Sequence, residues 1–218
     1  MKSFQEKMAA LQKTLEGRMP ADYIQIMHKA TADLRASGIQ EGVLKVGDKF
    51  PAFTLKNQDG LPIHSVDILK KGPILFTFYR GIWCPYCNMD LGYLQQNEEK
   101  LTGLGVQLFA ISPELPEFLQ KTKQQQKLGF DLLHDFKSEL GQELGLRFSL
   151  PTDLKALYAN QFKIDLDKHQ GHSDWTLPIP ARFLVDQNSV IQYVETNPDY
   201  TTRPALDAVY ALDFLKTK

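Results

Sequence analysis

The chain has 218 residues, 43% of them hydrophobic, and its 25 Lys and Arg against 26 Asp and Glu give a net charge of −1. A chain of this length and composition is globular and holds one large domain, or one domain with an appendage. Its near-neutral charge provides no positive field for phosphate backbones or anionic lipid, which argues against nucleic acid and membrane surfaces as partners.

The first residues argue against a targeting segment. Glu6 and Lys7 interrupt the apolar stretch that a signal peptide would need. Nowhere does the chain hold the roughly 18 consecutive apolar residues that would span a membrane. We therefore expect a cytoplasmic protein, in a compartment where glutathione and thioredoxin keep thiols reduced. A lone pair of cysteines is expected to be reactive there rather than structural.

Residues 1–42 are predicted to form an N-terminal helical extension. Apolar residues recur at the spacing of one helix face, at Phe4, Met8, Leu11 and Leu15. A second helix is expected from Pro20 to Ser37, with Gly38 just past its end. We expect these helices to cover the main domain or to form the interface of a homodimer, and assign them no cofactor.

Residues 43–218 are predicted to form a second unit, in which short strands alternate with helices. Strands are expected at 53–55, 73–79, 106–112, 130–133, 181–186 and 189–195. Helices are expected at about 85–101, 116–128, 138–144 and 204–216. Gln187 and Asn188 join the last two strands at hairpin spacing. This order predicts an α/β domain with a mixed central sheet flanked by helices on both faces.

Both cysteines lie in the stretch WCPYC, directly after a predicted strand. Pro85 suits the first position of a helix, which puts Cys84 at the N-cap and Cys87 in the first turn. The free N–H groups and positive end of a helix favour thiolate, and can bring a cysteine pKa from about 8.5 to roughly 3.5–7.5. Cys87 is near enough to attack a mixed disulfide or sulfenic acid on Cys84, or the reverse. The pair predicts thiol redox chemistry.

A zinc site is the alternative interpretation of the cysteine pair. A closed zinc site needs four ligands, so two would have to be histidines, and none shows the customary paired spacing to a CxxC. The histidines considered are His64, His134, His169 and His172. We therefore expect no metal and no other cofactor, and interpret residues 167–175 as a polar loop.

At these residues the sequence resembles a known family. WCPYC after a strand resembles the thioredoxin fold, and residues 44–60 with 72–87 resemble the opening of the alkyl hydroperoxide reductase/thiol-specific antioxidant (AhpC/TSA) proteins, the peroxiredoxins. Residues 177–186 and 197–204 are similar to their peroxiredoxin-like branch, which keeps a CxxC. The resemblance covers about 43–215. It implies a thioredoxin-like fold and a peroxidase that reduces hydrogen peroxide or organic hydroperoxides by a dithiol/disulfide cycle, with thioredoxin or glutathione as reductant.

The resemblance assigns the two cysteines in opposite ways. Peroxiredoxins carry Pro-x-x-x-Thr-x-x-Cys, and that pattern laid on Cys87 finds Arg80 at the Pro position and Cys84 at the Thr position. Thioredoxins place the attacking Cys directly after Trp, as Trp83 precedes Cys84, and have a cis-proline before a late strand, which Pro180 matches. We expect Pro180 to be cis. We also expect Cys84, as the more acidic and more exposed thiol, to attack first, and Cys87 to resolve.

Peroxide reduction also requires a donor that polarises the O–O bond. Arg80 and Arg182 are the candidates. Peroxiredoxins place an activating Arg at the position of Pro180, and Arg182 lies two residues further along the same strand. Side chains two apart share a face, so Arg182 is expected to reach the thiolate. An ordinary ion pair or a dimer contact is the alternative role for each arginine.

Two other functions are compatible with the cysteine motif. The CPYC sequence and Pro180 also fit a protein disulfide reductase similar to thioredoxin or glutaredoxin. The second function is that of a non-enzymatic redox sensor. In such a sensor, disulfide formation switches a partner surface that includes the N-terminal helices. A sensor would show no turnover with a reductant, whereas both enzymes would.

Overall fold

The computed structural model describes residues 2–215 and has strands alternating with helices from residue 54 onward. The strands are β1 (Thr54–Asn57), β2 (Pro62–His64), β3 (Ile74–Phe78), β4 (Gln107–Ser112), β5 (Asp131–His134), β6 (Arg147–Ser149), β7 (Thr176–Pro178), β8 (Ala181–Val185) and β9 (Ile191–Thr196). The α-helices are α1 (Phe4–Glu16), α2 (Ala21–Ala36), α3 (Ser65–Leu69), α4 (Pro85–Gly103), α5 (Pro116–Gln126), α6 (Glu139–Glu143), α7 (Thr152–Ala156), α8 (Leu166–Gln170) and α9 (Asp207–Tyr210). Further helical turns lie at Ile39–Gly42, Phe136–Ser138, Leu157–Gln161 and Asp213–Leu215.

Strand β3 lies inside the sheet, and all of its residues are buried. In the described part of the chain the main sheet has seven strands in the order β2-β1-β5-β4-β3-β8-β9, and β6 pairs with β7 separately. β3 is parallel to β4 and antiparallel to β8, so the sheet is mixed as predicted. The run ILFTF is apolar at nearly every position because helices cover both faces of this strand. The turn between β8 and β9 forms the predicted hairpin.

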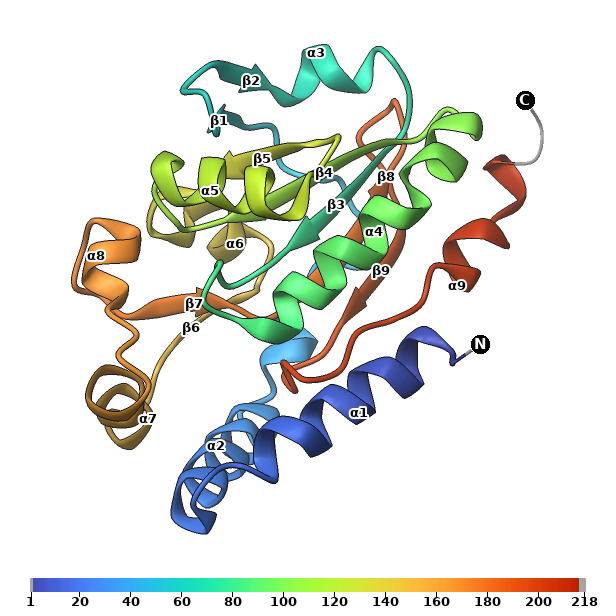
Figure 1. Ribbon diagram of the computed structural model, residues 1–218. Coiled ribbons are helices and arrows are strands. Elements are labelled where there is room, and N and C mark those ends of the chain that lie inside the picture. Colours follow the sequence, from blue (N-terminus) through green and yellow to red (C-terminus); the bar gives the residue numbers. More distant parts are fainter. Residues whose placement is uncertain (1, 216–218) are drawn as a thin grey trace.

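Alternate residues of the central strands enter two different hydrophobic clusters, one on each face of the sheet. On the first face Leu75 packs with residues of α1, α4, α5 and α9. On the second face Phe76 and Phe78 pack with residues of α3 and α6. Figure 1 shows α4 lying across the first face, with α9 and α1 beside it. The first turn of α4 follows the carboxyl end of β3 closely, and this turn holds both cysteines.

The two N-terminal helices pack onto the remainder of the chain. The α1 helix begins with a capping box between Ser3 and Glu6, and its Phe4 ring stacks on Tyr93 of α4 with centroids 3.9 Å apart. In α2, Met27 is buried in a third cluster with Leu154 and Tyr158. This third cluster joins α2 to α7 and α8. The helices therefore form part of the surroundings of α4, where the site lies.

The C-terminal helix predicted over residues 204–216 is wrong in its extent. The structure has two short helical pieces, α9 and the turn Asp213–Leu215, and residue 216 lies outside the described residues. At the predicted start of this helix, backbone groups are hydrogen-bonded to side chains instead of to one another. Arg182 donates to the Pro204 carbonyl, and the Leu206 amide donates to the Tyr93 hydroxyl. The short elements β2, α3, β6, α7, α8 and β7 were not predicted from the sequence. Most have five or fewer residues, too few for a periodic pattern.

Candidate active site

Cys84 caps the N-terminus of α4, as the sequence predicts. Its Sγ accepts hydrogen bonds from the Cys87 backbone amide at 3.4 Å and from Arg80 Nη2 at 3.2 Å. Pro85 occupies the first turn, where its missing N–H leaves no helical bond unmade. Both cysteines are unpaired and 0% exposed. The prediction that Cys84 is the more exposed thiol is therefore wrong, because the aromatic and arginine side chains around it cover the helix end.

The surroundings stabilise a thiolate on Cys84 and a thiol on Cys87. Burial by itself disfavours the Cys84 thiolate, but the hydrogen bond from the Cys87 side chain and the charges of Arg80 and Arg203 outweigh burial and hold the pKa of Cys84 well below its ordinary value. Burial, the hydrogen bond to Cys84 and the Cys84 negative charge raise the pKa of Cys87 well above its ordinary value. The two sulfurs therefore differ in the protonation state that their surroundings favour.

Arg80 is held at the thiolate by three aromatic side chains. Its guanidinium carbon lies 3.8 Å from the centre of the Tyr200 ring and 5.1 Å from that of Trp83. Nη1 donates to the Tyr158 hydroxyl at 3.1 Å, while Nη2 donates to Cys84. The predicted site residues Arg80 and Trp83 are therefore together at the sulfur. A fixed, fully buried cation beside a thiolate can also donate to a peroxide oxygen.

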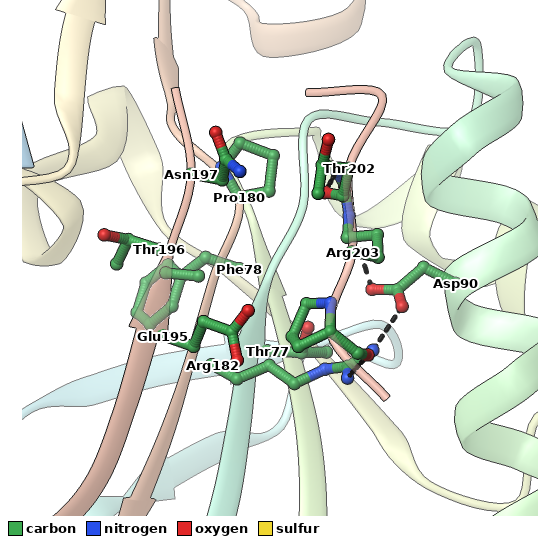
Figure 2. Close-up of a pocket in the computed structure, with 12 residues that line it drawn as sticks. Thr77, Phe78, Asp90, Pro180, Arg182, Glu195, Thr196, Asn197, Thr202 and Arg203 are labelled. Carbon is green, nitrogen blue, oxygen red and sulfur yellow. Dashed lines mark hydrogen bonds and ion pairs between the residues drawn. The ribbon is translucent and has the colours of Figure 1, made fainter. Parts of the chain in front are cut away.

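A second arginine contacts the other sulfur. Arg203 Nη2 lies 3.4 Å from Cys87 Sγ, and Arg203 Nε lies 3.5 Å from a carboxylate oxygen of Asp90. Asp90 also pairs with Arg182, and all three charged side chains are buried. Figure 2 shows Asp90 on α4 between the two arginines, with dashed lines to both. The space among them is about 10 Å³, which is room for at most one water.

The structure corrects the roles predicted for Arg182 and Pro180. Arg182 donates to Asp90 and to the Pro204 carbonyl, and neither sulfur is among its partners in the described residues. Because Arg182 lies opposite Thr77 in the sheet, its side chain meets α4 at Asp90, more than a turn beyond Cys84. No peptide bond in residues 2–215 is cis, so the prediction for Pro180 is also wrong. A trans bond lets the chain run on from β7 into β8.

A cavity of about 340 Å³ opens beside Cys84. Arg80 and Cys84 belong to its wall, and Cys87 does not. The wall is otherwise largely apolar and aromatic, and includes Leu15, Met19, Met27, Trp83, Tyr158 and Tyr200. Residues from α1 and α2 therefore help to enclose the sulfur, which the sequence did not reveal. Of the two cysteines, Cys84 is therefore the one that adjoins this cavity.

A buried carboxylate lies behind the loop that leads into α4. Glu114 is 0% exposed, and its Oε2 accepts from the Ile82 amide at 2.8 Å. Its Oε1 lies 2.8 Å from Nδ1 of His169, whose ring packs 4.2 Å from Phe118. Burial raises the pKa of Glu114, although His169 and the Ile82 amide oppose that rise. Gly81 is needed at this point, because a Cβ there would lie 2.4 Å from Trp83 Nε1 and 2.6 Å from Glu114 Oε1.

The sequence did not identify several side chains that complete the site. Tyr200 and Arg203 lie in the stretch 197–204, whose resemblance to the peroxiredoxin-like branch was a signal that these residues belong to the site. Tyr158 had no comparable signal, because it lies in a region without predicted elements. His169 was assigned to a polar loop, whereas it lies on α8 and belongs to the cavity wall.

Replacing Arg80 by Met should move the pH dependence of Cys84 alkylation to higher pH. Arg80 lowers the pKa of Cys84 by its charge and its hydrogen bond, so its removal raises that pKa and slows labelling at neutral pH. The measurement is the rate of iodoacetamide labelling of Cys84 against pH, followed by mass spectrometry. Arg147→Met is the matched control, since Arg147 donates to the Lys137 carbonyl away from the cavity. An unchanged profile in Arg80→Met would contradict the assigned role.

The sequence matches one protein family and several of its characterised members. The AhpC/TSA family model matches residues 46–194. The chain is 29% identical over 167 residues to the chloroplastic peroxiredoxin Q of Sedum lineare, covering 77% of this chain and 76% of that protein. It is 27% identical to peroxiredoxin Q of Oryza sativa subsp. japonica, covering 72% and 61%. Against peroxiredoxin Bcp of Escherichia coli K12 it is 31% identical over 103 residues, covering 47% and 65%.

Solved structures share the fold at lower identity. Peroxidoxin BcpB from Mycobacterium tuberculosis superposes with a TM-score of 0.60 at 18% identity, covering 79% of this chain and 97% of that one. AhpC from Mycobacterium tuberculosis superposes with a TM-score of 0.59 at 20% identity, covering 80% and 94%.

Proposed function

Because the chain belongs to the AhpC/TSA family, we propose that it is a thiol-dependent peroxidase in which Cys84 attacks the substrate. The observation that carries this proposal is the Cys84 sulfur itself. It lies at a helix N-terminus, 3.2 Å from a buried guanidinium, and Cys84 belongs to the wall of a cavity of about 340 Å³. A thiolate, a cationic donor and exclusion of bulk water are what peroxide reduction requires.

The cycle uses both sulfurs. The Cys84 thiolate attacks the hydroxyl oxygen of a hydroperoxide, so an S–O bond forms while the O–O bond breaks and its electron pair leaves with the distal oxygen. Arg80 donates to the peroxide as charge develops on it. Cys87 then attacks the sulfenic acid on Cys84, the two sulfurs form a disulfide, and the hydroxyl group leaves with the Cys87 proton as water. The substrate class is hydrogen peroxide or an organic hydroperoxide.

The disulfide must be reduced to restart the cycle, and we assign this step to thioredoxin or glutathione. The cytoplasm is the compartment proposed, since it supplies both. In the part of the chain that the structure describes, no helix has the length and apolar character needed to cross a bilayer. The deciding assay follows peroxide consumption with a thioredoxin system and, separately, with glutathione. The proposal would be contradicted if peroxide were consumed neither with the thioredoxin system nor with glutathione. Sedimentation velocity of the same protein tests whether it forms a homodimer.

Oxidised protein should contain an intramolecular disulfide between Cys84 and Cys87. The two residues lie within one turn of α4, and the Cys87 amide already contacts Cys84 Sγ at 3.4 Å. Mass spectrometry of protein treated with one equivalent of peroxide should show the loss of two hydrogens within a single peptide. A stable sulfinic acid on either cysteine, without a disulfide, would contradict this prediction.

Protein disulfide reduction is the second candidate function, favoured by the CxxC at a helix N-terminus. Two observations weigh against it. Both sulfurs are fully buried, and Pro180 is trans, whereas the thioredoxin pattern has a cis-proline at this position. Reduction of insulin disulfides, compared with peroxide consumption under the same reductant, separates the two enzymes. A redox sensor would give no turnover in either assay.

A further inference from the structure

Glu114 and His169 form a buried acid–imidazole pair that the cycle described above does not use. The His169 ring belongs to the wall of the same cavity as Cys84 and Arg80. Its Nδ1 lies 2.8 Å from Glu114 Oε1, and Nε2 has no hydrogen-bond partner among the described residues. Glu114 has no exposure, and its second oxygen is held by the Ile82 amide, so the carboxylate cannot turn away from the ring.

Both partners are fixed by the chain on either side of them. The Leu115 amide, next to Glu114 in the chain, donates to the His169 carbonyl at 2.8 Å, so a backbone bond holds the two segments together beside the side-chain contact. The ring also packs on Phe118, on the first turns of α5. An imidazole whose tautomer and orientation are set by a carboxylate is the usual form of a general acid or base in an active site.

The peroxide step creates a need for such a group. When the O–O bond breaks, the distal oxygen leaves as hydroxide or alkoxide, both of which are strong bases. Arg80 can stabilise that charge, but a guanidinium does not give up its proton in proteins. Cys87 keeps its proton for the resolving step because its pKa is raised. Another group that protonates the leaving oxygen would therefore assist this step. The cavity wall also includes Glu16 and Lys163, but His169 is the wall residue whose side chain is paired with a fully buried carboxylate.

We propose that His169 is the general acid of the peroxidase reaction and that Glu114 is its positioning residue. As Cys84 takes the hydroxyl oxygen, Nε2–H of His169 gives its proton to the distal oxygen, directly or through one water, and an alcohol or water leaves. The neutral imidazole takes a proton from solvent before the next cycle. This inference rests on the peroxidase function proposed above.

The leaving group provides the test. Hydrogen peroxide and tert-butyl hydroperoxide release strong bases that need a proton, whereas peracetic acid releases acetate, which does not. His169→Gln should lower kcat/KM for the first two substrates by about 10²-fold or more, and leave peracetic acid reduction close to the wild-type rate. Glu114→Gln, which keeps an acceptor for the Ile82 amide, should show the same selectivity to a smaller extent. His64→Gln is the matched control, because the His64 side chain on β2 pairs with Thr54 on β1, away from the cavity.

Each result of this comparison decides the assignment. Equal losses with all three oxidants would show that His169 only supports the structure, and would overturn the inference. Unchanged rates with all three in His169→Gln would overturn it as well. If the wild-type protein reduces none of the three oxidants, the peroxidase proposal itself fails, which is a separate outcome. Selective loss with hydrogen peroxide and tert-butyl hydroperoxide alone supports the general acid.

Discussion

Cys84→Ser is expected to abolish peroxide consumption, whereas Cys87→Ser should retain a single turnover. Cys84 adjoins the cavity, and its pKa is held well below the ordinary value by the Cys87 side chain, Arg80 and Arg203. Loss of the nucleophile should reduce kcat/KM by on the order of 10⁴-fold. Cys87→Ser leaves the attacking thiolate in place but removes the resolving sulfur, so a sulfenic acid or mixed disulfide should accumulate on Cys84.

Rapid mixing with one equivalent of peroxide measures that single turnover, and a dimedone adduct identifies the sulfenic acid by mass. The two variants serve as matched controls, since each removes one buried sulfur from the same turn of α4. The alternative assignment, which follows the peroxiredoxin spacing, makes Cys87 the attacking residue. If Cys84→Ser keeps the single turnover and Cys87→Ser loses it, the order proposed here is reversed.

Asp90→Ala should be the most destabilising of the substitutions considered, by about 3–5 kcal/mol in the free energy of unfolding. Asp90 is buried and is the carboxylate partner of both Arg182 and Arg203. Its removal leaves two guanidinium groups without a counter-charge in the interior, and their desolvation is then uncompensated. Urea denaturation followed by circular dichroism measures the loss.

Asp67→Ala is the control for this measurement. Asp67 pairs with Lys70 at 2.8 Å on the surface, where both side chains are more than half exposed. Such a pair contributes at most about 1 kcal/mol, because solvent and salt screen it. If Asp90→Ala lowers the free energy of unfolding by no more than about 1 kcal/mol, the prediction is contradicted. The arginines would then find other partners or water when the carboxylate is absent.

The sequence predicts the parts of this fold that have strong local signals. The alternating strands and helices from residue 54, the hairpin before β9 and the helix that begins at Pro85 are all confirmed. Pro85 carries most of that information, since it places Cys84 at the N-cap, where its sulfur accepts from the Cys87 amide. These features depend on residues that lie close together in the chain, so the local sequence pattern is enough to predict them.

The errors concern contacts between distant residues. Arg182 was placed at the thiolate because it shares a strand face with Pro180, but its position opposite Thr77 brings it to Asp90 instead. Arg203 does contact a sulfur, that of Cys87. It lies in an irregular segment, and the periodicity of the sequence does not predict the course of such a segment. The exposure of Cys84 was overestimated because nothing local reveals that Tyr200 and Trp83 hold Arg80 over it.

The cavity beside Cys84 is built from residues as far apart along the chain as Leu15 and Tyr200. Contacts of such long sequence separation are slow to form, because the entropy of closing the intervening loop opposes them. During synthesis on the ribosome, α4 and its two cysteines emerge well before Tyr200 and Arg203. A newly made chain thus passes through a period in which the sulfurs lack their enclosing side chains.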